Sequence, residues 1–194
     1  MLVVRSCVLF GKEKKHMSKI GRKPIDLAGV AVTQSGQVLS IKGVKGQFDH
    51  ELPACLQATI DGTTLAISLD QNTRKNRMVW GLHRALVANK VHGAGKGFEK
   101  LVKLVGLGYK GELKGKKIVF SIGYSHKVEY HLPEGVTVDI DKSGQKILVK
   151  AADKFVLGNV CDGIRSIRPP EPYKGTGIML DGEVIIRKAG KTKA

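Results

Sequence analysis

The C-terminal part of the chain concentrates side chains that could bind an anion. Three prolines, Pro169, Pro170 and Pro172, precede the run Tyr-Lys-Gly-Thr-Gly at residues 173–177. A lysine ammonium group neutralises phosphate, and glycines beside it let a backbone come close to a phosphate chain. The prolines stiffen the segment, so little entropy is lost when a partner holds it. The sequence therefore predicts a contact surface at residues 173–177, in addition to a stiff connector.

Other residues could support catalysis or metal binding, but their spacing does not favour either. Asp139 and Asp141 share one face of a predicted strand, where a solvent-facing role beside a turn is the simpler interpretation. His83 and His92 are not spaced like the two histidines of a zinc-binding helix. Gly93–Gly97 lacks the spacing of a nucleotide-binding phosphate loop. We therefore expect no enzyme, no catalytic residue, no metal ligand and no cofactor.

The charge of the whole chain narrows the class of partner. Its 194 residues include 33 Lys and Arg against 17 Asp and Glu, a formal net charge of +16. Such an excess requires a counter-charge, which nucleic acid, an anionic membrane or an acidic protein could supply. No apolar run approaches the ~18 residues of a membrane span. The three cysteines lack CxxC spacing, which argues against zinc and disulfides and favours a reducing, intracellular setting.

Among these partners the sequence favours folded RNA. Aromatic residues are only 5% of the chain, so a row of base-stacking rings is not expected. No predicted helix presents the Asn, Gln and Arg set that reads a major groove. Recognition should therefore rest on phosphate, ribose and shape, which suits folded RNA better than sequence-specific DNA.

The elements that must position these residues occur twice. Residues 50–53 match residues 130–133 at an offset of 80 (130 − 50). Farther on, Val79, Arg84 and Leu86 correspond to Val160, Arg165 and Ile167. Because these matches keep their order at a nearly constant offset, they indicate an internal duplication.

Each half predicts two hairpins followed by a helix. The expected strands are 38–42, 47–52, 56–60 and 65–69 in the first half and 117–122, 127–132, 136–140 and 146–150 in the second. The first helix should be capped by Asn72 or Thr73 and end at His92–Gly93. The second should end at Pro169–Pro170. The expected core stripes are Val79, Leu82 and Leu86 in the first helix and Leu157, Val160, Ile164 and Ile167 in the second.

The predicted fold class is α+β, with two tandem duplicated domains that each pack a small, mostly antiparallel sheet on one helix. The domains span residues 17–97 and 98–187, and a basic tail follows at 188–194. Residues 87–116 form the junction, part of which, Phe98–Val105, alternates like a strand. A further strand is expected after Val184. Residues 1–16 read as an upstream leader outside the fold.

Several motifs together resemble one known family. They are GRKPI, LVGLGYK, SIGYSHKVEYHLP, RPPEPYKGTGI and DGEVIIRKAGK, and they occur in this order. The chain resembles the bacterial-type large-subunit ribosomal protein six family over residues 17–192. The resemblance implies a structural constituent of the large ribosomal subunit that binds ribosomal RNA near the sarcin–ricin loop and stalk base. It would support subunit assembly and the site where translation GTPases dock.

The resemblance also implies which residues contact RNA, mainly in the second domain. The carried-over residues are Tyr173, Lys174, Gly175, Thr176 and Gly177, with Arg165, Arg168, Arg187, Lys188 and Lys191 beside them, and Ser125 and His126 of the GYSH turn. Met179–Leu180 departs from the family, which commonly has Arg-Tyr there. The implied partners are large-subunit RNA and neighbouring ribosomal proteins near the stalk base, with no membrane and no small-molecule substrate. The implied localisation is the cytoplasmic ribosome.

Two other functions stay open on the sequence alone. The chain could be a free-standing RNA chaperone or regulator built from two RNA-binding modules. It could also be an RNA-processing enzyme, although no nucleophile or metal cluster supports this. Sedimentation with the large subunit through a salt wash separates the first alternative from a ribosomal protein, and turnover by purified protein would identify the second.

Overall fold

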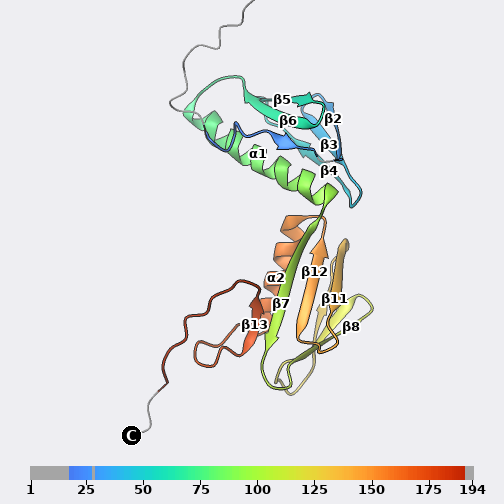
Figure 1. Cartoon of the computed structure of the whole chain (residues 1–194), viewed down its shortest axis with the longest axis vertical. Coiled ribbons are helices and arrows are strands. Elements are labelled where there is room, and N and C mark those ends of the chain that lie inside the picture. Colours follow the sequence, from blue (N-terminus) through green and yellow to red (C-terminus); the bar gives the residue numbers. More distant parts are fainter. Residues whose placement is uncertain (1–17, 28, 191–194) are drawn as a thin grey trace, which may run out of the picture.

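Short alternating segments separated by glycine turns form two α+β repeats (Figure 1). The structure is a computed structural model that describes residues 18–27 and 29–190, so the expected leader at 1–16 lies outside the described residues. The first repeat contains β1 (Ile25–Asp26), β2 (Ala31–Ser35), β3 (Val38–Lys42), β4 (Gln47–Glu51), β5 (Leu56–Asp61), β6 (Thr64–Leu69) and α1 (Arg74–Gly95). The second contains β7 (Phe98–Val105), β8 (Lys110–Lys114), β9 (Lys117–Ser121), β10 (Val128–His131), β11 (Val136–Ile140), β12 (Lys146–Ala151), α2 (Lys154–Ile167) and β13 (Gly177–Leu180).

The duplication is visible in the sheet topology. The first repeat has the strand orders β2-β3-β4 and β1-β6-β5, and the second has β10-β9-β8 and β11-β12-β7-β13. With β7 in the place of β1, the two repeats match strand for strand, and all pairs are antiparallel. The predicted fold class is therefore confirmed. The second repeat has one additional strand, β13, which pairs with the free edge of β7.

The predicted hairpins are present with small shifts at their ends, whereas four short strands were not predicted. These are β1, β2, β8 and β13. The strand expected after Val184 is wrong, because residues 183–190 have no regular secondary structure. The chain instead forms β13 just before this point, where Gly177–Leu180 pairs with Val102–Val105.

Helix α1 begins as predicted but presents a different face to the core. The Thr73 side chain accepts a hydrogen bond from the Asn76 amide, which confirms the N-cap. The helix continues to Gly95, past the predicted end. The predicted core stripe is wrong at Leu82 and Leu86, which are exposed, whereas Val79 packs against the core.

The buried face of α1 is set by its largest side chain. Trp80 is buried, and its indole Nε1 donates to the Ile67 carbonyl at 2.7 Å. Val87, Val91 and Ala94 follow on the same face and pack with Leu39 of β3 in the first core. Because the Trp80 ring removes more apolar area from water than a leucine, its face turns inward.

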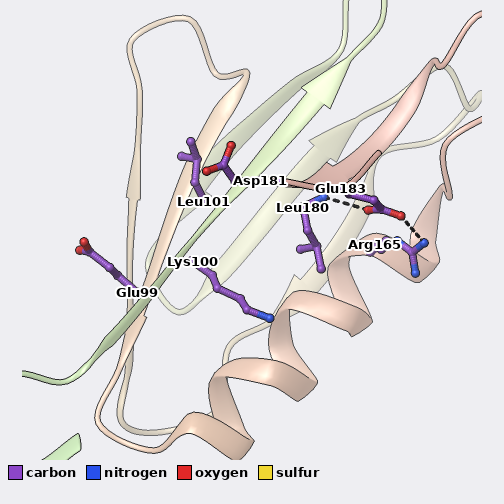
Figure 2. Close-up of a pocket in the computed structure, with 8 residues that line it drawn as sticks. Glu99, Lys100, Leu101, Arg165, Leu180, Asp181 and Glu183 are labelled. Carbon is purple, nitrogen blue, oxygen red and sulfur yellow. Dashed lines mark hydrogen bonds and ion pairs between the residues drawn. The ribbon is translucent and has the colours of Figure 1, made fainter. Parts of the chain in front are cut away.

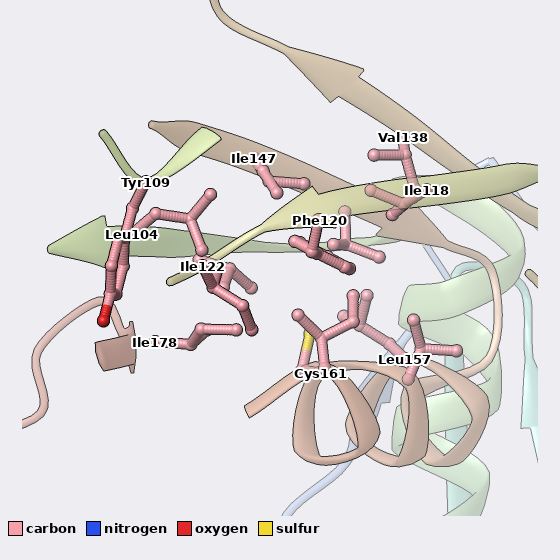
Figure 3. Close-up of a cluster of buried hydrophobic side chains, with 14 of the residues drawn as sticks. Leu104, Tyr109, Ile118, Phe120, Ile122, Val138, Ile147, Leu157, Cys161 and Ile178 are labelled. Atoms are coloured by element: carbon pink, nitrogen blue, oxygen red, sulfur yellow. The ribbon is translucent and has the colours of Figure 1, made fainter. Parts of the chain in front are cut away.

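Helix α2 follows its prediction closely. The Asp153 carboxylate caps it through the Phe155 amide at 2.9 Å, and Leu157, Val160 and Ile164 are buried. Figure 3 shows Leu157 and Cys161 facing Phe120 of β9 in the core of the second repeat. Among the described residues, neither helix combines the length and apolarity that crossing a bilayer requires.

The two repeats meet where α1 passes into β7. Gly97, with a φ of 76°, turns the chain from the helix into the strand. Gly93 lies against the backbone before α2, where a Cβ would come within 2.1 Å of the Ala152 carbonyl oxygen. The contact between these two segments therefore requires glycine at position 93. The expected junction at 87–116 thus contains the end of α1, β7 and β8, and the strand expected at Phe98–Val105 is confirmed as β7.

Candidate nucleic-acid interface

Residues 169–177, here called the proline–glycine loop, connect α2 to β13. The Glu171 amide donates to the Thr176 carbonyl at 2.9 Å, and the Gly175 amide donates to the Glu171 carbonyl at 3.0 Å. The Thr176 hydroxyl donates to the Glu171 carboxylate at 3.1 Å. These bonds close the loop on itself and leave Tyr173 and Lys174 exposed at its tip, with Tyr173 54% exposed.

The two glycines of this loop are buried and have roles inside the protein. Gly177 has a φ of 146°, and a Cβ there would lie 2.7 Å from the Pro169 oxygen. Gly175 has a φ of 72°, and the Arg187 guanidinium covers the position that its Cβ would take. Both glycines therefore shape the loop, and the exposed tip between the prolines and Gly175 is the part open to a partner.

The loop is held at both of its ends. The Ile178 amide donates to the Arg168 carbonyl at 2.9 Å, which ties the start of β13 to the end of α2. Met179 and Leu180 pair with Lys103 and Val102 of β7, and Leu180 packs on the core. The departure Met179–Leu180 thus supplies two apolar residues to an edge strand, and Leu180 is the one that packs on the core.

Arg168 links the end of α2 to the GYSH turn, Gly123–His126. Its guanidinium lies 5.3 Å from the Tyr109 ring centroid and 5.2 Å from that of Tyr124, and it donates to the Ile122 carbonyl. The Tyr124 hydroxyl donates to the Ile167 carbonyl at 3.0 Å. These contacts place the GYSH turn beside the proline–glycine loop, although the two are far apart in sequence.

The GYSH turn presents rings and polar groups to solvent. Tyr124 and His126 stack with an interplanar angle of 14° and a centroid separation of 6.0 Å. Both side chains and Ser125 are exposed. Sequence reasoning included the GYSH turn as a candidate, with Ser125 and His126 named in it, but missed Tyr109. The signal for Tyr109 was a tyrosine in the glycine-containing motif GLGYK.

Arg165 is less available than the other predicted contacts. Its Nη2 pairs with Glu183 Oε1 at 2.5 Å, and the other Glu183 oxygen accepts the Leu180 amide (Figure 2). Its buried Nε has no hydrogen-bond partner among the described residues. This pair lines a hollow of about 520 Å³ with Lys100. A phosphate would have to compete with Glu183 for Arg165.

Three cations after β13, Arg187, Lys188 and Lys191, were predicted to contact RNA, and the structure describes the first two. Arg187 and Lys188 are exposed, and the Lys188 amide donates to the Pro172 carbonyl at 2.9 Å. This bond holds residues 183–190, here called the final segment, against the proline–glycine loop. Lys191 lies outside the described residues. Within the described part of the chain, no three His, Cys, Asp or Glu side chains are grouped as metal ligands.

Comparisons with known proteins give one consistent result. A family described as "Ribosomal protein L6" matches residues 105–180, which include both turns of the candidate interface. The "Large ribosomal subunit protein uL6" of Syntrophomonas wolfei is 46% identical over 176 residues, which cover 90% of this chain and 98% of that protein. Proteins of the same name from Synechococcus sp. and Moorella thermoacetica are 44% and 43% identical and cover 91% and 92% of this chain.

Proposed function

This chain belongs to the L6 (uL6) family of large ribosomal subunit proteins, and from this premise we propose how it acts on the ribosome. Its class is a ribosomal structural protein with a ribosomal, cytoplasmic localisation. The proposal is that it binds large-subunit RNA directly near the sarcin–ricin loop and stalk base, beside neighbouring ribosomal proteins. It would act by positioning RNA for subunit assembly and for the translation-factor site, without a catalytic step.

One observation supports the proposed RNA contact. The closed proline–glycine loop presents Tyr173 and Lys174 beside the GYSH turn. Lys174, Arg187 and Lys188 place positive charge around the loop tip, which suits phosphate. The exposed ring of Tyr173 and the stacked rings of the GYSH turn offer flat apolar surfaces for ribose or an unstacked base. Both groups lie at the same end of the second repeat.

The surface is formed before binding. Hydrogen bonds fix the loop to α2 at Arg168 and to the final segment at Lys188, and β13 pairs with β7. A preformed surface loses little conformational entropy when RNA binds, so more of the contact energy contributes to affinity. This stiffness supports a role in fixing the orientation of RNA helices.

The substitution Lys174→Ala tests the contact. If Lys174 neutralises one phosphate, the slope of log affinity against log salt should decrease by about one unit, and binding at low salt should weaken. The measurement is a filter-binding titration with large-subunit RNA at several salt concentrations.

The matched control is Lys150→Ala. Lys150 carries the same charge in the same repeat but pairs with Asp139 at 2.7 Å, so its loss should leave the slope unchanged. Equal slopes for the Lys174 variant and the unmodified chain would remove Lys174 from the interface. If the chain separated from large subunits in a moderate salt wash, a free-standing RNA chaperone would be the better function.

A further inference from the structure

Helix α1 carries a row of apolar side chains on its solvent side. Met78, Leu82 and Leu86 follow one another at four-residue spacing and are 67%, 57% and 39% exposed. Residues at this spacing lie along one line of a helix. Trp80, Val87 and Val91 already fill the opposite, buried face. The exposed row therefore has no role in the core of the first repeat.

The row continues into a groove between the two repeats. Leu86 lines this groove together with Phe48 of β4 and with Ala152 and Phe155 of the second repeat. The groove has a volume of about 440 Å³, and Phe155 is 72% exposed at its far side. Exposed apolar side chains that are contiguous, rather than scattered, mark a surface that contacts another molecule. We call this surface the α1–Phe155 face.

The border of this face is positively charged. The 22 residues of α1 include no Asp or Glu, and by helical position Arg74, Lys75 and Lys90 lie beside the apolar row. Arg84 lies on another side of the helix, where it donates to the Lys23 and Pro24 carbonyls. Lys90 lines the groove with Lys154, and its Nζ donates to a main-chain carbonyl, that of Asp49, at 2.6 Å. Among the described residues Asp153 is the one acid that lines the groove, and its carboxylate caps α2. An acidic partner would meet complementary charge here.

The apolar row and its basic border together distinguish between three classes of partner: RNA, a second copy of this chain and another protein. RNA would satisfy the basic border but would gain nothing from burying methionine and leucine side chains. A second copy of the chain could cover the apolar row, but each copy brings a net charge of +16. An amphipathic helix with an acidic border matches both the row and its surroundings.

We propose that the α1–Phe155 face is the docking surface for an acidic amphipathic helix of another protein. Met78 to Leu86 covers eight steps of the helix, or about 12 Å along its axis. The groove lengthens this surface beyond Leu86. A partner helix of roughly three turns would place apolar anchors at i, i+4 and i+7 along the row. This surface is separate from the proline–glycine loop, so the chain could hold RNA and this partner together.

The test uses the full chain and a synthetic probe. The probe is a fluorescent helical peptide with leucines at i, i+4 and i+7 and glutamates on its other faces. We expect saturable binding by fluorescence anisotropy, weakened about tenfold or more by Leu82→Ser and by Phe155→Ser. Both side chains are largely exposed, so the fold should persist, which circular dichroism checks. The matched control is Val44→Ser, an equally apolar change at a side chain that is 94% exposed outside this face.

The remaining outcomes identify other occupants. Equal affinity in the Leu82 and Val44 variants, or equal binding of a peptide with lysine in place of glutamate, would overturn the proposal. Displacement of the peptide by an RNA duplex that binds the Lys174 variant equally well would show instead an RNA surface. A tenfold gain in peptide affinity after deletion of residues 1–16 would show that this segment occupies the face. Concentration-dependent dimerisation that Leu82→Ser abolishes would show a second copy there.

Discussion

Two histidines connect the sheet and helix of the first repeat. His50 is only 8% exposed, and its Nε2 lies 3.0 Å from His83 Nδ1, so one ring donates to the other. Burial, the Lys90 charge and His83 lower the pKa of His50 to about 4. Burial also lowers the pKa of His83. Both rings are therefore neutral at pH 7, and one of the two facing nitrogens accepts the shared hydrogen bond.

This pair predicts an acid-sensitive first repeat. A histidine with a lowered folded pKa takes up protons more readily when unfolded, so stability falls as pH decreases from about 6.5 to about 4. For His50 the shift corresponds to a loss of about 3 kcal/mol across that window. Urea unfolding followed by fluorescence of Trp80, the single tryptophan, measures this loss. His50→Leu should flatten the dependence, and an unchanged slope in that variant would contradict the assignment.

Single residues also show where sequence reasoning reached its limit. The exposed Lys174 could be inferred from its neighbours, because charge and glycine spacing are local properties. The position of Arg168 between Tyr109 and Tyr124 could not, since three distant segments must meet to form it. Leu82 had the right spacing for a core position, but spacing cannot choose between two apolar faces of one helix. Trp80 made that choice through packing.

Helix α2 contains two glycines with opposite surroundings. A Cβ at Gly158 would meet no atom within 4 Å, whereas a Cβ at Gly163 would lie 2.6 Å from the Tyr130 hydroxyl oxygen. Tyr130 packs against the core of the second repeat, so it cannot move away without loss of contacts. One glycine is therefore replaceable and the other is required by packing.

The matched substitutions Gly158→Ala and Gly163→Ala test this difference. Alanine in a helix interior gains roughly 0.5–1 kcal/mol over glycine, so Gly158→Ala should stabilise the chain. Gly163→Ala has the same propensity gain but overpacks the core, which costs about 1–3 kcal/mol. Thermal unfolding by circular dichroism measures both. Equal melting temperatures would show that Tyr130 leaves its position at no cost.

The elements differ in how well sequence defines them. The hairpins of β5–β6 and β11–β12 have alternating apolar residues and recognisable turns, and both were predicted. Strand β13 begins at Gly177 just after three prolines, which is a composition typical of a loop. It is a strand because β7 offers an unpaired edge, and that edge exists only in the folded sheet. Strand β8, with Lys110, Glu112 and Lys114, is similarly polar.

At the scale of the whole molecule, the net charge of +16 opposes folding and favours RNA binding. We expect the melting temperature of the free protein to rise between about 20 mM and about 200 mM salt, because screening weakens self-repulsion. RNA affinity should fall over the same range. Differential scanning calorimetry and RNA titration measure the two effects. A melting temperature that falls with salt would mean that attractive ion pairs outweigh the repulsion.

The additional strand of the second repeat has a further consequence for the protein before assembly. An uncovered strand edge can pair with an edge of another chain and start aggregation. Strand β7 has eight residues, and β13 pairs with four of them, Val102–Val105. Newly made protein that lacked residues 169–180 would expose this edge at a time when no RNA covers it. Strand β13, which follows the loop that we propose contacts RNA, is therefore expected to protect the unassembled chain from aggregation. A deletion across the loop and β13 would then reduce the supply of usable protein as well as its affinity for RNA.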